Sequence, residues 1–229
     1  MSDMALNRYH RNFKAISLDE QEKLKASTVA VIGCGGLGGY IIEEFTRLGI
    51  GNLIVADGDK FDVTNLNRQL LSTESNIGEF KAKAAEKRIR EINSEVKVKT
   101  ITERLDANNS PSLLAKADLV CDALDSIESR LTIERVCNDL RIPLVFASIA
   151  GWYGMVGVSF PGDFSLAKIF SQSRVGIEKV WGNPAFTPAV VASLSVAESV
   201  KVLTGRSVPL RNSWLQIDLL EMEFERFSL

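Results

Sequence analysis

Cysteine and histidine are scarce in this chain of 229 residues, which contains three Cys and one His. The cysteines, Cys34, Cys121 and Cys137, are odd in number and show no CxxC spacing, so neither a disulfide framework nor a zinc site is expected. We expect all three to be small buried residues. With a single histidine, a hydrolase that uses a Ser/His/Asp or Cys/His site is excluded unless His10 is its catalytic histidine.

An excess of either charge is also missing. The 27 Lys and Arg residues face 29 Asp and Glu, for a formal net charge of −2. No global basic field therefore attracts nucleic acid, which we do not expect as a partner. No window approaches the run of about 20 apolar residues that a membrane span needs, and the N-terminus is not signal-like. We expect no membrane association, a cytoplasmic location and a sizeable core.

What the chain does contain is a glycine-rich turn between two apolar segments. Residues 29–32 lead into Gly33-Cys34-Gly35-Gly36-Leu37-Gly38, and the next apolar segment ends on Asp57. Such glycines let the backbone turn tightly and bring peptide N–H groups to a phosphate at a helix N-terminus. An acidic residue closing the second strand can then bind ribose hydroxyls. The pattern predicts a nucleotide site, and it leaves open whether hydride or phosphoryl chemistry follows.

Hydrophobic periodicity predicts strands and helices that alternate over most of the chain. Residues 17–26 read as a helix whose capping box is Ser17 with Glu20. Alternation of this kind requires right-handed crossovers and predicts a parallel sheet with helices on both faces. Strands are expected at 28–33, 52–57, 96–101, 118–122 and 143–149, and helices at 37–48, 81–93, 110–116 and 127–140.

The pattern changes after Ala150. Glycines punctuate 151–162 and 163–184 shows no clear period, so we expect a loop-rich excursion there. A helix follows from about Pro188 to Leu203, and segments 213–218 and 221–227 alternate like antiparallel strands. The predicted fold class is α/β, a Rossmann-like, mostly parallel sheet with a C-terminal antiparallel extension. Residues 1–27 would form an arm and helix, 28–150 the nucleotide-binding core, and 151–229 the remainder of the same domain.

A long polar loop, residues 58–80, stands where an ordinary dinucleotide-binding unit would already enter its next helix. The loop carries Asn65, Arg68 and Gln69, and Lys81 follows at the expected helix start. Arginine offers a planar fork of donors to phosphate, and lysine a mobile point charge. We therefore expect a clamp on a triphosphate rather than a nicotinamide cleft.

Two aspartates follow the predicted strand at 118–122. An Asp just outside a strand, at the mouth of the crevice, can hold a hydrated magnesium ion between triphosphate oxygens. The alternative role is a helix N-cap. Position favours metal binding for Asp125, and Asp122 is the weaker candidate.

Several blocks of residues, taken in order, go further than a glycine fingerprint alone. They are Arg8-Tyr9-His10-Arg11, Gly33–Gly38, Asp57-Gly58-Asp59, Asn65-Leu66-Asn67-Arg68-Gln69, Lys81 and Asp125. Over essentially its whole length the chain resembles the ThiF/MoeB/HesA adenylyltransferases, relatives of the ubiquitin-activating enzymes. The resemblance implies ATP-dependent adenylation of the C-terminal glycine of a small ubiquitin-like sulfur carrier ending in Gly-Gly, of the ThiS or MoaD type, with release of pyrophosphate.

The resemblance also implies a role for each matching position. Arg11 would be an arginine finger that reaches the triphosphate of the neighbouring subunit, which makes a homodimer the catalytic unit. Asp125 would hold Mg²⁺. The implied catalytic residues are Arg11, Arg68, Lys81 and Asp125, and the ATP-binding residues are Gly33, Gly35, Gly36, Gly38, Asp57, Asp59, Asn65, Arg68, Gln69 and Lys81.

Two departures from the family pattern modify these expectations. The chain lacks the two CxxC pairs that hold zinc in many relatives, so we predict no zinc. Residues 150–190 contain no cysteine, so a thioester or acyl-disulfide intermediate is not expected. The stretch Gly151-Trp152-Tyr153-Gly154 would either line a groove for the carrier's tail or simply pack as strand and turn.

Three other functions stay open at this point. An NAD-dependent oxidoreductase is supported by the glycine fingerprint and Asp57, but not by the Arg/Gln/Lys loop. A non-enzymatic carrier-binding or scaffold protein on this fold is opposed by the intact set Arg11, Arg68, Lys81 and Asp125. A relative that activates a tRNA-borne carboxylate would use the same chemistry, and the slightly acidic net charge makes that acceptor less attractive.

Overall fold

A single sheet organises the computed structural model, which describes residues 8–171 and 181–229. Residues 1–7 of the expected arm and helix, and part of the expected loop after Ser171, therefore lie outside the described residues. The eight strands have the order β3-β2-β1-β4-β5-β6-β7-β8. The first five strands along the chain pair with one another only in parallel. They are β1 (Thr28–Ile32), β2 (Asn52–Ala56), β3 (Lys97–Ile101), β4 (Leu119–Asp122) and β5 (Leu144–Ala150). Antiparallel pairing then adds β6 (Tyr153–Ser159), β7 (Ser213–Asp218) and β8 (Glu223–Ser228).

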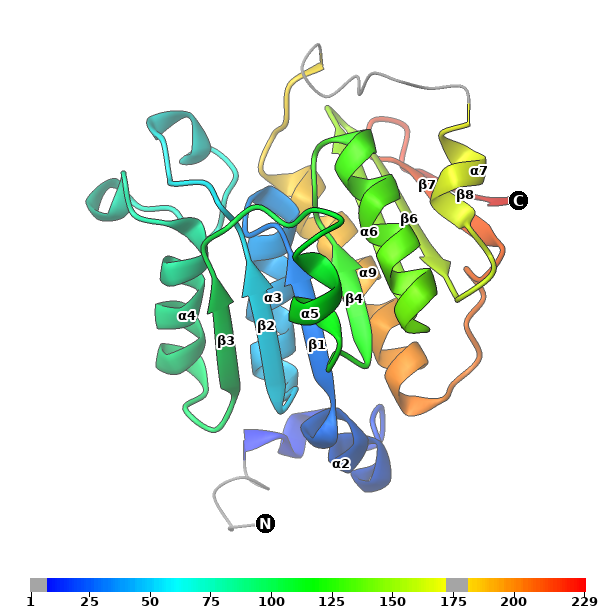
Figure 1. Ribbon diagram of the computed structural model, residues 1–229, viewed down its shortest axis with the longest axis horizontal. Coiled ribbons are helices and arrows are strands. Elements are labelled where there is room, and N and C mark those ends of the chain that lie inside the picture. Colours follow the sequence, from blue (N-terminus) through cyan, green and yellow to red (C-terminus); the bar gives the residue numbers. More distant parts are fainter. Residues whose placement is uncertain (1–7, 172–180) are drawn as a thin grey trace.

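Helices cover both faces of the sheet. Figure 1 shows α3, α4 and α9 behind it and α5, α6 and α7 in front. The described helices are α2 (Leu18–Ala26), α3 (Gly36–Leu48), α4 (Lys81–Ile92), α5 (Ser110–Leu114), α6 (Ile127–Leu140), α7 (Ser165–Ile169) and α9 (Phe186–Thr204), with short 3-10 turns at His10–Asn12, Val63–Asn65 and Glu74–Asn76. The Rossmann-like fold class and the antiparallel extension are confirmed.

The central strand β1 shows why two cores form. Its side chains alternate between the faces, so Val29 and Val31 join the cluster under α3, α4 and α9, whereas Ala30 and Ile32 join the cluster under α5 and α6. All four are at most 1% exposed. A strand buried on both faces must be apolar throughout, as a parallel sheet covered by helices requires.

Strand β6 corrects the expectation of a loop at 151–162. Its glycines are not loop signals, because they allow other groups to approach the strand closely. A Cβ on Gly154 would collide with Val191 of α9, and one on Gly157 would collide with the ring of Phe146. Gly151, at φ +59°, and Gly162, at φ +95°, do serve turns, before and after β6. Helix α7 was also not expected, because its 5 residues are too short to show a period.

Helix α9 corrects a second expectation. It has the length and composition of a membrane-spanning helix, although the sequence analysis found no such segment. Half of the apolar window is buried inside the protein, with Val191, Ala192 and Val196 at most 3% exposed. The helix packs on α3, β5 and β6. Burial against the sheet therefore accounts for its apolar sequence.

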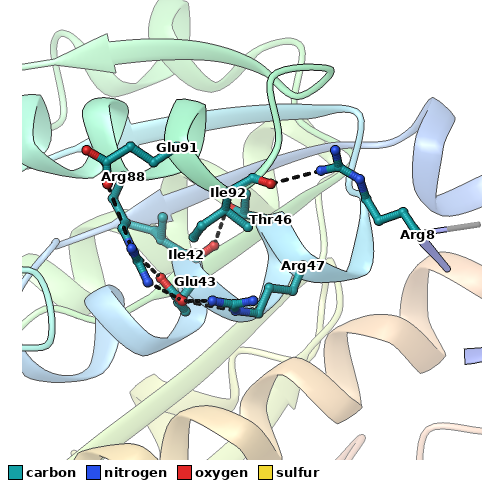
Figure 2. A network of polar contacts seen from close by, with 8 residues as sticks. All are labelled: Arg8, Ile42, Glu43, Thr46, Arg47, Arg88, Glu91 and Ile92. Carbon is teal, nitrogen blue, oxygen red and sulfur yellow. Dashed lines mark hydrogen bonds and ion pairs between the residues drawn. The ribbon is translucent and has the colours of Figure 1, made fainter. Parts of the chain in front are cut away.

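An ion-pair network fastens α4 to α3. In Figure 2, Glu43 of α3 lies between the guanidinium groups of Arg47 and Arg88. Arg88 of α4 donates to both carboxylate oxygens at 2.8 and 2.9 Å, and Arg47 donates at 2.7 Å. Burial alone would raise the pKa of Glu43, but the hydrogen bonds from Arg88 and Arg47 lower it. The N-terminal segment is also attached to α4. Arg8 Nη1 donates to the carbonyl of Ile92, the last residue of that helix, at 2.9 Å.

Helix α2 begins as predicted and is tied to the segment after α9. The capping box is present: the Glu20 amide donates to Ser17 Oγ at 3.2 Å, and the Ser17 amide to Glu20 Oε2 at 2.8 Å. Arg206 donates to the two Glu20 oxygens at 2.5 and 2.7 Å. These hydrogen bonds, with Arg206 as the largest cause, lower the pKa of Glu20 to about 2.

The Glu20 contacts predict how Arg206→Ala responds to acid. A carboxylate whose pKa is about 2 in the folded state, against 4.5 ordinarily, stabilises the fold above pH 4.5 and loses this contribution as the pH falls toward 2. We expect the variant's free energy of unfolding to fall less over that window than the wild type's. Urea denaturation at a series of pH values measures it, and an unchanged pH dependence would contradict the pairing.

Candidate functional site

One large cavity opens at the carboxyl ends of the parallel strands and extends along β6 and β7. Its volume is about 1110 Å³, above the roughly 300–1,000 Å³ common for small-molecule sites. The cavity thus has room for a nucleotide and part of a second ligand. Of the residues predicted from sequence, it brings together Gly33, Gly35, Gly36, Asp57, Asp59, Arg68, Gln69, Lys81 and Asp125.

The glycines of the turn divide into two kinds. Gly33 has φ +97° and would bring a Cβ to 2.6 Å from the Ala123 carbonyl oxygen, while a Cβ on Gly38 would collide with the Gly33 carbonyl. Gly38 therefore packs α3 against the turn and does not line the cavity. A Cβ on Gly35 or Gly36 would come no closer than 3.6 Å to another group. No neighbouring protein group therefore requires a glycine at either position. The space beside Gly35 and Gly36 opens into the cavity, next to the first turn of α3, which has no side-chain cap.

Asp57 joins the glycine turn to the polar loop. Its Oδ2 accepts from the Cys34 amide at 2.7 Å, and its Oδ1 from the Asp59 amide at 2.8 Å. Burial raises the pKa of Asp57, and the two backbone donors oppose that shift. Each oxygen keeps acceptor capacity toward the cavity, which suits the predicted contact with ribose hydroxyls.

Asp59 holds two cations at the cavity wall. Arg104 Nη2 lies 2.9 Å from its Oδ1, and Lys81 Nζ lies 3.7 Å from its Oδ2. The hydrogen bond from Arg104 is the main cause that lowers the pKa of Asp59, with a smaller contribution from Lys81. Sequence reasoning missed Arg104, because it belongs to no motif. Only the neighbouring positions of β2 and β3 in the sheet bring it to Asp59.

The polar loop contributes Arg68 and Gln69. Arg68 Nη1 donates to the Thr64 carbonyl at 3.0 Å and to Asn67 Oδ1 at 2.8 Å, which sets its direction at the cavity wall. Gln69 is buried, yet its side-chain oxygen has no hydrogen-bond partner among the described residues. A buried, unpaired acceptor on a cavity wall is expected where a ligand or its hydration completes the site.

Asn65 is not brought to the cavity wall. Its Oδ1 accepts from the Asp62 amide at 3.1 Å, and its carbonyl accepts from the Gln69 amide at 2.9 Å. It therefore shapes the turn that carries Gln69. A direct contact with phosphate stays a prediction that this geometry does not support.

The two aspartates after β4 have different surroundings. Asp122 is 1% exposed and pairs with the buried Arg130 at 3.0 Å, while its other oxygen accepts from the Leu124 amide at 2.9 Å. Burial raises the pKa of Asp122, and Arg130 opposes that shift. Arg130, which the sequence analysis missed, also donates to the Ala147 carbonyl at 2.6 Å and to that of Leu124. This pair therefore pins the loop before α6, and the buried carboxylate of Asp122 does not line the cavity, where a metal would bind.

Asp125 is exposed at the cavity and makes no hydrogen bond or ion pair within the described part of the chain. The same part contains no group of three or more His, Cys, Asp or Glu residues that could hold a metal ion. A single carboxylate still fits magnesium, which keeps several waters and binds through one or two carboxylates plus substrate phosphates. The residues present fit a magnesium–nucleotide complex, not a cage made of protein ligands.

Arg11 lies away from the cavity of its own chain. It belongs to the 3-10 turn His10–Asn12, at the end of the sheet where the parallel strands begin (Figure 1). The buried Tyr9, two residues earlier, anchors this segment. Its hydroxyl accepts a hydrogen bond from the side chain of Asn93, just beyond α4, at 2.9 Å. Within one chain Arg11 therefore cannot act on the cavity. Its action on a second chain stays a prediction.

The second half of the cavity is largely aromatic. Tyr153, already considered as a groove residue, lies with its ring centroid 5.3 Å from that of Trp181. Trp214 and Gln216 of β7 complete this wall, and no motif marks them. Asn67 Nδ2 donates to the Asn183 carbonyl at 3.1 Å, so the segment that leads into α9 also contacts the polar loop.

All three cysteines are free and buried, as expected. Burial raises the pKa of the Cys121 thiol to about 12 and raises that of Cys34 as well. A thiolate is the nucleophilic form of cysteine. None of these thiols is therefore suited to form a thioester with a ligand in the cavity.

Comparison with known proteins identifies relatives over the full length. The sequence profile of the ThiF family matches residues 8–229. The chain is 34% identical to the sulfur carrier protein adenylyltransferase of Thermus thermophilus, covering 98% of this chain and 87% of the relative. It is 29% identical to the molybdopterin-synthase adenylyltransferase of Haemophilus influenzae, covering 97% and 94%.

Solved structures show the same fold. The crystal structure of Escherichia coli MccB with ATP superposes with a TM-score of 0.80 at 26% identity, covering 97% of this chain and 71% of MccB. The structure of PaaA gives a TM-score of 0.85 at 23% identity, covering 100% and 74%.

The buried pair Asp122–Arg130 predicts the effect of Arg130→Met. Removing one partner leaves a buried carboxylate unpaired, which costs roughly 3–5 kcal/mol of stability. Arg135→Ala is the matched control, because Arg135 is an exposed residue of the same helix, and it should change stability by no more than about 0.5 kcal/mol. Urea denaturation at pH 7 compares the two variants, and equal losses would refute this role.

Proposed function

The chain belongs to the ThiF family and is an ATP-dependent adenylyltransferase, and we propose that it activates the C-terminal glycine of a small ubiquitin-like sulfur carrier of the ThiS or MoaD type. The observation that carries the proposal is a single cavity with two unlike halves. One half has the glycine turn, Lys81 and the unpaired Gln69 oxygen. The other half, along β6 and β7, has room for an extended peptide tail.

ATP would lie in the first half of the cavity. Asp57 is placed for the ribose, and the open sides of Gly35 and Gly36 with the first turn of α3 are placed for phosphate. Lys81 and Arg68 supply positive charge, and Gln69 a neutral amide. A phosphate bound there would compete with Asp59 for the Lys81 ammonium, which now lies 3.7 Å from that carboxylate.

The reaction needs no catalytic base from the protein. An α-carboxyl group has a pKa of about 3.3–3.7, so the carrier's C-terminus is already a carboxylate at neutral pH. One of its oxygens forms a bond to the α-phosphorus as the bond from that phosphorus to the bridging oxygen breaks, and pyrophosphate leaves. The protein's contribution is to align the two substrates and to stabilise the charge of the transition state. The scarcity of histidine is therefore no obstacle.

Asp125 is the residue that would hold magnesium, which when bound neutralises part of the triphosphate charge. Lys81 and Arg68 would act on the same charge directly. The NAD-dependent oxidoreductase that the glycine fingerprint left open gains no support, because the named activities of the relatives are adenylyl transfers. Cytoplasmic location and a homodimeric catalytic unit remain part of the proposal.

Pyrophosphate exchange tests the proposal. Labelled pyrophosphate should enter ATP only when a Gly-Gly carrier is added, and Lys81→Ala or Asp125→Ala should lower the rate by about 10²–10³-fold. Lys87→Ala is the matched control, because Lys87 lies exposed on the same helix as Lys81 and outside the cavity wall. Full exchange in both the Lys81 and Asp125 variants would refute the site.

Mixing two inactive variants tests whether Arg11 acts across a dimer. Arg11→Ala and Asp125→Asn should each be inactive alone. After mixing and subunit exchange, half of the dimers carry one intact site of two, so activity should return to about a quarter of the wild-type value. Failure to regain activity, with mixed dimers present by native mass spectrometry, would contradict action in trans.

A further inference from the structure

One carboxylate on the cavity wall contacts two cations that come from different segments. Asp59 Oδ1 accepts from Arg104 Nη2 at 2.9 Å, and Asp59 Oδ2 lies 3.7 Å from Lys81 Nζ. All three residues line the cavity. Because the two cations use different oxygens, Lys81 can leave Asp59 while Arg104 stays bound to it.

The two contacts differ in strength. An N–H···O hydrogen bond is usually about 2.7–3.2 Å long, so Arg104 makes a hydrogen bond and Lys81 a longer ion pair. The hydrogen bond from Arg104 is also the largest cause that lowers the pKa of Asp59, and the charge of Lys81 contributes less. Lys81 is therefore the partner that a phosphate group can draw away from Asp59 more easily.

The backbone holds Arg104 beside Asp59. A Cβ on Gly58 would lie 2.9 Å from the backbone nitrogen and from Cγ of Arg104, so the two loops meet only because this residue is glycine. Asn109 Nδ2 donates to the Arg104 carbonyl at 3.0 Å, which fixes the loop after β3. The Lys81 amide donates to the Asp59 carbonyl at 3.0 Å. With the main chain fixed on both sides, only the Lys81 side chain has to move when it leaves Asp59.

The charge balance of the cavity wall makes the Arg104 guanidinium important. The acidic side chains on this wall are Asp57, Asp59, Glu103, Asp106 and Asp125, and the basic ones are Arg68, Lys81, Arg104 and Arg130. Arg130 is already paired with Asp122. Without Arg104, the negative charge of Asp59 would have only Lys81 as a partner among the described residues. It would then hold Lys81 more strongly and would also repel a triphosphate.

We propose that Arg104 is a positioning residue for ATP: by holding Asp59, it leaves the Lys81 ammonium available to the triphosphate. The side chain of Arg104 is 84% exposed, against 11% for Lys81, so Arg104 acts from the rim and Lys81 from the interior of the cavity. Arg104 need not touch the nucleotide. The inference rests on the part of the proposed function that binds ATP beside Lys81, and it does not depend on which carrier is used.

A double-mutant cycle tests the proposal. The dissociation constant of Mg-ATP is measured by isothermal titration calorimetry at low salt, where exposed ion pairs are least screened. The proteins compared are the wild type, Arg104→Ala, Asp59→Asn and the double variant. Arg90→Ala is the matched control, because Arg90 is an exposed arginine whose ion pair with Glu86, at 3.0 Å, lies outside the cavity wall. The KM values for ATP and for a Gly-Gly carrier in pyrophosphate exchange give a second readout.

We expect Arg104→Ala to weaken Mg-ATP binding about three- to fivefold, the range of a partly exposed ion pair. Its KM for ATP should rise by a similar factor, with the KM for the carrier unchanged. In the Asp59→Asn background the same substitution should cause no further loss, because no carboxylate remains to retain Lys81. Arg104→Lys, which keeps the charge, should recover most of the affinity, and Arg90→Ala should bind Mg-ATP like the wild type.

Wild-type affinity in Arg104→Ala would overturn the proposal. Equal losses with and without the Asp59 carboxylate would overturn it too, because Arg104 would then contact the nucleotide itself or only support its loop. A wild type that binds Mg-ATP and gives the expected cycle, but shows no exchange with ThiS-type or MoaD-type carriers, overturns the proposed carrier and supports the role of Arg104. A wild type that does not bind Mg-ATP overturns both.

Discussion

The half of the cavity proposed for the nucleotide depends on the carboxylate of Asp57. One oxygen accepts from the Cys34 amide in the glycine turn, and the other accepts from the Asp59 amide at the start of the polar loop. These two hydrogen bonds fix the glycine turn, which follows β1, relative to the polar loop, which follows β2. Asp59 in turn holds Lys81 and Arg104. Burial raises the pKa of Asp57, and the two backbone donors that fix its position oppose that shift.

Two ion-pair clusters support this arrangement. Glu43 and Arg88 fasten α4, which begins with Lys81, to α3, which begins at the glycine turn (Figure 2). Asp122 and Arg130 pin the loop that carries Asp125. Each cluster is satisfied by several hydrogen bonds, which is the condition under which buried charges are tolerated. Their role is therefore to fix geometry, and the apolar cores on both faces of the sheet supply the driving force for folding.

The features that could be predicted from sequence are those set by local chemistry. Gly33, Asp57 and Lys81 stand at the ends of regular elements, where backbone conformation or strand order leaves little choice. Strand β6 was missed because Gly154 and Gly157 read as loop signals, whereas they make room for Val191 and Phe146. Arg104 and Trp214 could not be found, because only the order of strands in the sheet brings them to the cavity. Asn65 stands in a matching motif, yet its side chain bonds to its own loop.

In the proposed reaction, the group that attacks the α-phosphorus of ATP is the C-terminal carboxylate of a protein. Intact-mass spectrometry of a Gly-Gly carrier, after incubation with the wild-type protein and Mg-ATP, tests this most directly. We predict a carrier that has gained one AMP at its C-terminus, with pyrophosphate released in equal amount. A carrier that gains a single phosphate, or one whose mass stays unchanged while ATP is consumed, would contradict adenylyl transfer to a protein tail.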